Sequence, residues 1–441
     1  MLETSYVIGY IVLVLIIGYV SGRKQTGDNF MIANRKLGLS EFVATVVASS
    51  IGGGFLVAYT AYIYEFGIGT LSAIFGYAIG FVLFGLVAKR IRKTAHQNNF
   101  HTLADYFNFH STKKVSHFIA VMIGITFTFW LITQFIAGTQ ILSAISGYSY
   151  ELSLLISASV VLVYLILGGF QSVVRTDVFQ YLVLLFLIFL IGFIMVHTAH
   201  VPLIEFTKDE TSPSLIISFL IYTPLTVWHS VDIWQRVYAA KSDRVVMWGM
   251  ILSGLFVLVI GFGITLVAYS VRVALPGIDP SHAFIYGMQN LLSPGVLGLG
   301  IILVFAAIMS SIDSIAFVLG SSFAKDGITC LKKRQLTSDE LRYFTRIGIV
   351  LVILLSALSA YFLRSVIDAT LILAGFGMAL TPAILGTFKW KLKPNAIIIS
   401  VSAGFVYAIA WIIAGVILPE TMISTVLVSA AVLVVFQKSL R

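Results

Sequence analysis

One stretch of the chain places hydroxyl groups inside an otherwise apolar run. Residues 306–314 read AAIMSSIDS, and Ala307, Ser310, Ser311 and Ser314 recur at intervals of three and four. On a helix these four residues share one face, here called the hydroxyl stripe. Three hydroxyl oxygens beside small side chains suit a small, hard cation such as sodium. The alternative is that the serines bond carbonyls of their own helix or join neighbouring helices.

Two acidic residues also lie within apolar runs, where ionisable side chains are costly and usually functional. Asp313 belongs to the same stretch, and Asp177 lies in an earlier run. Asp313 is a candidate cation ligand, a proton-carrying carboxyl, or a protonated acid with no role in transport. Asp177 is a candidate cation ligand or the partner of Arg175 or Arg236 in a structural ion pair.

Two other apolar runs carry an interruption. Residues 48–54 read ASSIGGG, and residues 223–226 read TPLT. Consecutive glycines weaken a helix, and a proline removes one backbone hydrogen bond. Backbone groups freed within a bilayer must be satisfied by protein, ions or water in a cavity. We expect carbonyls of Ala48 and Ile51 to face the hydroxyl stripe, although glycines that only allow close packing and a harmless kink at Pro224 are the alternative.

The composition indicates a membrane protein. Of 441 residues, 59% are hydrophobic and 11% are charged, whereas soluble domains carry about 25% charged residues. Apolar runs long enough to cross a bilayer recur from one end of the chain to the other. We predict an all-α polytopic protein with thirteen transmembrane helices, at about 5–22, 39–63, 67–90, 115–146, 150–168, 171–198, 213–239, 243–270, 294–324, 338–363, 366–388, 394–416 and 420–437.

The net charge of +9 reflects topology. With the amino terminus outside and the carboxyl terminus in the cytoplasm, only Lys208, Arg272 and Arg364 of the 28 basic residues fall outside. This asymmetry follows the positive-inside rule and argues against a nucleic-acid partner. We therefore expect a multi-pass protein of the plasma (inner) membrane. The loops 199–212 and 273–293 are long enough for short surface helices.

The two interrupted helices are five helices apart. In transporters built from two inverted repeats, interrupted helices at matching positions of the two repeats indicate the binding site. We predict one transmembrane domain over 1–441, with a first repeat at about 39–198 and a second at about 213–388. The flanking helices are 5–22, 394–416 and 420–437.

Four segments, taken in order, resemble the sodium/solute symporter family, whose members share the fold of the bacterial leucine transporter LeuT. Residues 27–38 are similar to the family's loop after its first helix, and residues 168–180 to its most recognisable signature. Residues 235–241 are similar to the end of its seventh helix, and residues 307–311 to its sodium motif. The resemblance covers nearly the whole chain and implies sodium as the coupling ion.

The resemblance also implies a sodium site. Its ligands are the backbone oxygens of Ala48, Ile51 and Ala307 and the hydroxyls of Ser310 and Ser311.

Some members of the family bind a further sodium ion, and the matching positions here are Asp177, Ser310, Asp313 and Ser314. Asp313 stands where a hydroxyl is expected. Two carboxylates around one monovalent cation leave net negative charge, which favours protonation of one acid or coupling to protons.

The solute is less well specified. The polar residues that grip sugars in sugar-transporting members match Phe55 and Ile74 here, which are apolar and argue against a sugar. A half-helix amino terminus near the glycines favours a carboxylate, so an amino acid or small organic acid is preferred. His229, Trp228 and Phe55 also suit ordinary packing. We expect the pocket to be lined by Ser50, Gly53, Phe55, Trp228, His229, Asp232 and Phe376.

Together these features predict a sodium-coupled symporter that imports a small organic solute by alternating access, with a monomer able to transport. The helices at 39–63, 67–90, 213–239 and 243–270 are expected to rock as one bundle. The alternative is a solute sensor that acts with a separate signalling partner. No selectivity filter marks a channel, and no clustered catalytic set marks an enzyme.

Overall fold

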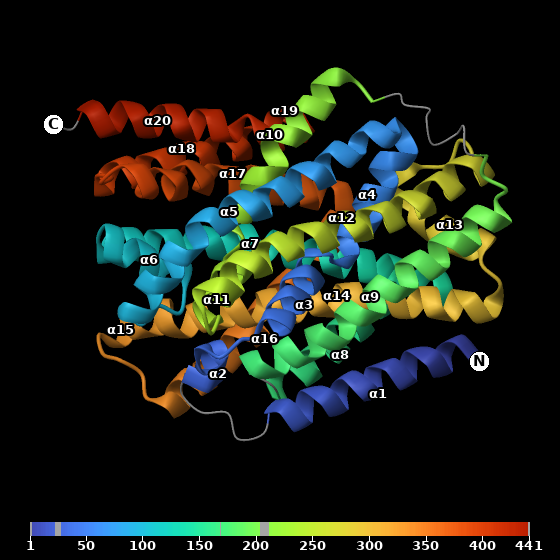
Figure 1. The fold of residues 1–441 in the computed structure, drawn as a ribbon, viewed down its shortest axis with the longest axis horizontal. Coiled ribbons are helices and arrows are strands. Elements are labelled where there is room, and N and C mark those ends of the chain that lie inside the picture. Colours follow the sequence, from blue (N-terminus) through green and yellow to red (C-terminus); the bar gives the residue numbers. More distant parts are fainter. Residues whose placement is uncertain (1, 23–27, 168, 203–210, 440–441) are drawn as a thin grey trace.

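The computed structural model describes residues 2–22, 28–167, 169–202 and 211–439, and nearly all of these residues are helical. The long helices run roughly along one axis of the molecule (Figure 1). Helix α1 begins at one end of this axis, called the amino end, and α20 finishes at the other, called the carboxyl end. Within the described residues the all-α prediction is confirmed.

Most predicted spans coincide with single helices. Their bounds are α1 Leu2–Gly22, α5 Leu71–Gln97, α7 Lys113–Ser146, α8 Tyr150–Leu167, α9 Phe170–Thr198, α12 Asp243–Ala274, α14 Pro294–Ser322, α16 Ser338–Leu363, α17 Val366–Lys389, α18 Pro394–Ile413 and α20 Thr425–Ser439. Over the described residues, nine helices are long and apolar enough to cross a membrane. Two bent pairs of helices could each form one further span. The apolar helices Ile8–Ser21 and Tyr150–Val163 are shorter, so the count of thirteen stays a prediction.

The first interruption lies where the glycines predict it. Helix α3 (Leu39–Ser50) and helix α4 (Gly53–Phe66) meet at an angle of 59°. The backbone leaves the helix at Ile51, with φ −100° and ψ 74°, and Gly52 precedes the first turn of α4. A Cβ atom on Gly52 would lie 2.6 Å from the Ser311 hydroxyl. Only glycine therefore fits at this approach to α14.

The second interruption lies elsewhere than predicted. Helix α10 (Pro213–His229) continues through Pro224, and the 52° bend occurs at Ser230, before α11 (Val231–Ala239). The placement of the break at residues 223–226 is therefore wrong. A proline removes one backbone bond without necessarily ending a helix. Here the Thr223 hydroxyl adds a bond to the same turn, donating to the carbonyl of residue 219 at 2.8 Å.

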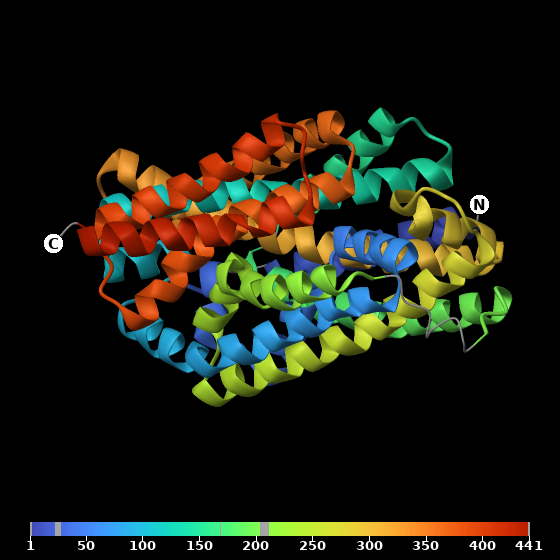
Figure 2. The ribbon, with the colours of Figure 1, turned by 90° about the horizontal axis from the view of Figure 1, so that it is seen from above.

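The helices pack in two groups, one around α5 and one around α14. Helix α5 packs most extensively against α10 and α12, whereas α14 packs against α7, α9 and α16. Helices α17, α18 and α20 pack together along one side of the molecule, and α5 and α12 lie on the opposite side (Figure 2). The α3–α4 pair contacts both α12 and α14, so its bend lies between the groups. The two inverted repeats remain a prediction.

Short elements cover both ends of the molecule. The remaining helical elements are α2 Asp28–Ile32, η1 Ala33–Arg35, η2 Ile68–Thr70, α6 Leu103–His110, η4 Pro280–His282, α13 Ala283–Leu291, η5 Phe323–Ile328, α15 Thr329–Lys332 and α19 Pro419–Ile423. Helix α13 confirms the surface helix predicted in 273–293. In the other loop, residues 203–210 lie outside the described residues.

Candidate functional site

The hydroxyl stripe of α14 faces the broken end of α3. The Ser310 hydroxyl donates to the Ala48 carbonyl at 2.9 Å, and the Ser311 hydroxyl donates to the Ser49 carbonyl at 3.0 Å. Both serines are fully buried. The last carbonyls of a helix have no partner within it, and here the break leaves them deep inside the protein. The serine hydroxyls of α14 thus bond backbone carbonyls at the end of α3 that have no partner within that helix.

The other residues of the predicted sodium site gather at the same place. The Ala307 carbonyl accepts a second bond from the Ser310 hydroxyl at 3.0 Å, and Ile51 is fully buried at the bend. Ser49 was not predicted, although its carbonyl occupies the same turn as that of Ala48. The carbonyl end of a helix carries partial negative charge. Together with the hydroxyls, it forms an uncharged, oxygen-rich environment that can hold a dehydrated alkali ion.

A buried arginine lies next to this site. Arg236 of α11 is fully buried, and its Nη2 atom lies 3.1 Å from Asp177 Oδ2 and 2.7 Å from Ser314 Oγ. Its Nε atom donates to the Thr45 hydroxyl at 2.9 Å, and Thr45 in turn donates to Asp177. Of the two arginines considered for Asp177, the structure pairs it with Arg236.

Ser49 connects the arginine to the broken helix. Its hydroxyl donates to Asp232 Oδ2 at 2.9 Å, and the same oxygen lies 3.5 Å from Arg236 Nη1. Arg236, Asp177, Asp232, Thr45 and Ser314 are called the arginine cluster. Asp232 was predicted to line the solute pocket, but it lies in this cluster instead.

Asp313 occupies a different position from the other predicted second-site residues. It is fully buried, and its Oδ2 atom accepts a hydrogen bond from the Thr176 hydroxyl at 3.3 Å. Asp177 and Ser314 meet at Arg236, while Ser310 bonds the carbonyl of Ala48. The four residues of the predicted second cation site therefore make their hydrogen bonds in three different places: at Arg236, at the Ala48 carbonyl and at Thr176.

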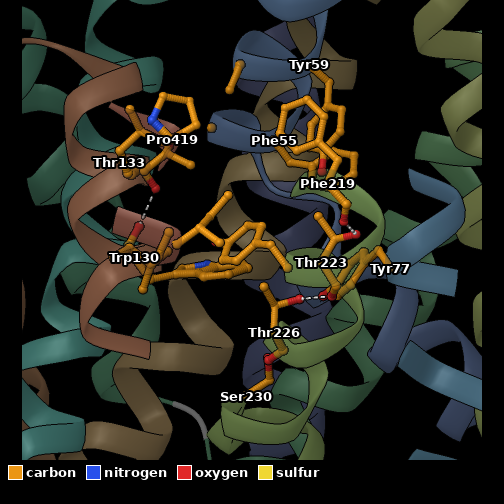
Figure 3. Close-up of a pocket in the computed structure, with 18 of the residues that line it drawn as sticks. Phe55, Tyr59, Tyr77, Trp130, Thr133, Phe219, Thr223, Thr226, Ser230 and Pro419 are labelled. Atoms are coloured by element: carbon orange, nitrogen blue, oxygen red, sulfur yellow. Dashed lines mark hydrogen bonds between the residues drawn. The ribbon is translucent and has the colours of Figure 1, made fainter. Parts of the chain in front are cut away.

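A cavity of about 120 Å³ lies beside the start of α4. An aromatic group forms one wall, with the rings of Phe55 and Tyr59 stacked 4.1 Å apart, and Trp130 lies on the opposite side (Figure 3). The hydroxyls of Thr223 and Thr226 already donate to carbonyls of their own helix. The described lining residues include no Asp, Glu, Lys or Arg. The cavity is thus aromatic, with hydroxyl, amide, indole and imidazole groups as its polar components.

Of the residues predicted to line the pocket, Phe55 and His229 do so. The His229 ring also bonds the Thr381 hydroxyl at 3.0 Å, through Nδ1.

The other predicted pocket residues lie outside the cavity lining. Ser50 bonds a carbonyl of its own helix, and Gly53 packs against α14. Trp228 contacts an aromatic ring of α5, and Phe376 stacks on a ring of α18. These residues were predicted to line a pocket beside the broken stretches. In the structure these side chains pack within their own helix or against neighbouring helices.

Several lining residues were missed in the sequence. Phe55, Tyr59 and Tyr62 recur at intervals of four and three, which places an aromatic stripe on one face of α4. Thr133 and Gln134 form a polar pair within the apolar α7, and the Gln134 side-chain oxygen accepts from the backbone N–H of Gly54 at 3.2 Å. Both patterns are visible in the sequence, although neither shows which helices face each other.

Ion pairs join elements at the carboxyl end of the molecule. Arg92 lies 2.8 Å from Asp243, and Lys325 pairs with Asp105 of α6. Burial raises the pKa of the Asp105 carboxyl, but the Lys325 ammonium and two backbone N–H groups outweigh it, so the pKa lies below its usual value. The cavity lies on the other side of the breaks, toward the amino end, because its lining follows α4 from residue 54 to residue 62.

Known proteins are similar to this chain in sequence and in fold. The model of the sodium:solute symporter family matches residues 30–396. The osmoregulated proline transporter OpuE of Bacillus subtilis is 25% identical over 432 residues, which cover 92% of this chain and 88% of that protein. The sodium/proline symporter of Escherichia coli is 26% identical over 432 residues, covering 91% and 86% respectively.

Among solved structures, that of a Na⁺-coupled sialic acid symporter superimposes with a TM-score of 0.81 at 18% identity, covering 99% of this chain and 98% of that one. A nucleobase-cation-symport-1 family transporter superimposes with a TM-score of 0.60 at 15% identity, covering 93% and 95%. At these identities the similarity shows the fold alone. The family match spans most of the chain, and therefore this protein belongs to the sodium:solute symporter family.

Proposed function

We propose that this sodium:solute symporter imports a small zwitterionic amino acid of the proline type together with sodium. One observation carries the sodium site: Ser310 and Ser311 reach across to the open carbonyls of Ala48 and Ser49. A sodium ion there would take hydroxyl and carbonyl oxygens, the donors that hard cations prefer. The proposed ligands are the hydroxyls of Ser310 and Ser311 and the carbonyls of Ala48, Ile51 and Ala307.

The proposed solute follows from the chemistry of the cavity. The cavity lies beside the amino terminus of α4, and the partial positive charge of a helix amino terminus favours a carboxylate. The aromatic wall of Phe55 and Tyr59 suits the ammonium group of an amino acid through cation–π attraction. A neutral zwitterion also fits a lining that lacks charged side chains. Relatives named as proline transporters support the same class of solute.

We place the amino end of the molecule outside the cell and the carboxyl end in the cytoplasm. With this orientation the cavity lies on the outer side of the two breaks. The bundle of α3–α4, α5, α10–α11 and α12 would rock against α7, α8, α14 and α16. Sodium would then leave into the cytoplasm, where its concentration is low, and release the solute.

Two measurements on the same purified protein test this function. Thermal unfolding is followed with L-proline and with other amino acids, in sodium and again in potassium, because a bound ligand raises the midpoint by an amount that grows with the logarithm of its concentration relative to Kd. Uptake of labelled proline into proteoliposomes is measured under an inward sodium gradient. We expect proline to stabilise the protein only in sodium, and labelled proline to accumulate in the proteoliposomes against its own gradient. Stabilisation without uptake would favour the solute sensor, and equal results in potassium would contradict sodium coupling.

A further inference from the structure

A further cavity of about 380 Å³, called the outer cavity, is lined by α4, α7, α8, η4, the turn between α16 and α17, and the start of α17. Its lining includes Gln140, Asp279 and Arg364. On α7 the lining passes from Gln134 in the cavity beside α4 to Gln140 in the outer cavity, about 9 Å farther along the helix. Helix α7 starts beside α6 at the carboxyl end, so this shift leads toward the amino end, which we place outside the cell.

The outer cavity carries both signs of charge, whereas the described lining of the cavity beside α4 includes no Asp, Glu, Lys or Arg. The Asp279 carboxylate accepts a hydrogen bond from the backbone N–H of Ser281 at 2.9 Å. This bond holds the pKa of the Asp279 carboxyl below its usual value, and the side chain is 60% exposed. The guanidinium of Arg364 is always protonated. A fixed anion and a fixed cation therefore line one cavity.

The Arg364 guanidinium is held in place by its neighbours. Its Nη2 atom lies 2.9 Å from Glu151 Oε1, and its Nε atom donates to the Tyr361 carbonyl at 3.0 Å. The rings of Tyr150 and Tyr361 lie 4.7 Å and 5.1 Å from the guanidinium carbon. These two hydrogen bonds use two of the five N–H groups, and the side chain is 49% exposed. The guanidinium is thus preorganised, which lowers the entropic cost of binding a ligand.

A ligand with one carboxylate and one ammonium group matches this pair of charges. A carboxylate accepts parallel hydrogen bonds from a guanidinium, and an ammonium group donates to a carboxylate. The Glu151 carboxylate occupies part of the same guanidinium, so a ligand carboxylate at Arg364 competes with it. This competition makes the site weaker than a guanidinium without an acidic partner.

We propose that the outer cavity is a second, weaker binding site for a zwitterionic amino acid, where Arg364 binds the carboxylate and Asp279 binds the ammonium group. The inference rests on the proposed function, because it assigns the same class of solute to both cavities. In the proposed orientation, solute from outside reaches this site before the cavity beside α4. The described lining includes none of the proposed sodium ligands, so binding in the outer cavity does not depend on sodium.

The test is equilibrium dialysis of radiolabelled L-proline, the probe, against purified protein in detergent. Binding is measured in sodium and again in potassium, up to proline concentrations far above those that fill the cavity beside α4. Wild type is expected to bind two molecules per chain in sodium, one tightly and one weakly. In potassium only the weak site is expected to remain.

Three variants test the two charges. Arg364→Gln and Asp279→Asn are each expected to weaken binding in potassium at least about tenfold, because each loses a charge-assisted hydrogen bond. Glu151→Gln is the matched control: it breaks the same ion pair but keeps the guanidinium, and it is expected to bind proline more tightly. The sodium-dependent site is expected to be unchanged in all three, which also shows that the variants fold.

Two analogues test the charges on wild type, without any variant. Pyrrolidine keeps the ammonium group and cyclopentanecarboxylate keeps the carboxylate. Each is expected to displace labelled proline in potassium at least about tenfold less well than unlabelled proline does. Displacement by either analogue as good as that by proline would overturn the inference.

The other outcomes separate the inference from the proposed function. Equal loss of the weak site in Arg364→Gln and Glu151→Gln would show that the ion pair is only structural, and would overturn the inference. No binding in potassium beside intact sodium-dependent binding would also overturn it, while the proposed function stands. No proline binding in either salt would overturn both.

Discussion

The hydroxyl of Ser310 lies 2.9 Å from the carbonyl oxygen of Ala48, to which it donates a hydrogen bond. The two residues are 262 positions apart in the chain, on α14 and at the broken end of α3. The bond joins the two helix groups at the point where α3 has lost its own backbone partners. Any ion bound between them would hold both groups in one arrangement, which is the physical basis for coupling ion binding to a conformational change.

Ser49 is expected to connect the sodium site to the arginine cluster. Ser49→Ala removes the hydrogen bond to Asp232 and leaves a buried carboxylate oxygen with one partner fewer, which costs about 1–3 kcal/mol. We expect a lower midpoint of thermal unfolding and weaker stabilisation by sodium. The measurement is thermal unfolding of the purified protein during a sodium titration.

The matched control for Ser49 is Thr60→Ala. The Thr60 hydroxyl is also buried, but it donates to the carbonyl of Leu56 within its own helix. A Ser49→Ala variant that responds to sodium as the Thr60→Ala variant does would contradict the connection.

Asp313 is expected to carry an exchangeable proton. It is fully buried within α14, and burial disfavours the charged form of a carboxyl group. Wild-type uptake is expected to differ between pH 6 and pH 8, and Asp313→Asn to make uptake the same at both. Initial rates in proteoliposomes, at a fixed sodium gradient, give the comparison. Equal wild-type rates at both pH values, with one sodium per solute in both proteins, would count against a proton at Asp313.

The aromatic wall is expected to determine affinity for the solute. Phe55→Ala removes the ring that stacks on Tyr59. A desolvated cation–π contact is worth about 2 kcal/mol or more, which corresponds to roughly thirtyfold, so we expect KM for proline to rise at least about tenfold, with little change in sodium dependence. Phe193→Ala, at a ring that is 63% exposed, is the control. The idea fails if both variants keep the wild-type KM in a proline uptake assay.

The orientation is testable through the single cysteine. Cys330 is exposed and lies in α15 at the carboxyl end, which we place in the cytoplasm. A membrane-impermeant maleimide is expected to label it only after cells are permeabilised. In a Cys330→Ser background, Asn290→Cys in the exposed part of α13 is expected to be labelled in intact cells. The reverse pattern would show that the orientation is inverted.

The parts of the fold that depend on local patterns were predictable from the sequence. Apolar length set the helix ranges, and three consecutive glycines located the first break at Gly52. The second break was misplaced, because Pro224 is a stronger local signal than Ser230, yet the helix tolerates the proline. The position of a bend depends on tertiary packing that a single segment does not encode.

The same distinction applies to the site. The three-and-four spacing identified Ser310 and Ser311, since one helix face is a local property. The partners of Asp177 remained open between Arg175 and Arg236, and the aromatic wall at Tyr59 was missed. Both depend on which helices lie side by side, and the sequence periodicity of one helix contains no information on that.

The sodium dependence of the variant Ser310→Ala with Ser311→Ala tests the central claim most directly. Each hydroxyl is a proposed ligand, and loss of a bond to a charged group costs about 1.5–3 kcal/mol, so the sodium concentration for half-maximal uptake is expected to rise at least about tenfold. Ser321→Ala, whose buried hydroxyl bonds only a carbonyl of its own helix α14, is expected to behave as wild type. A double variant with wild-type sodium dependence would contradict a sodium ion bound between the serines of α14 and the broken end of α3.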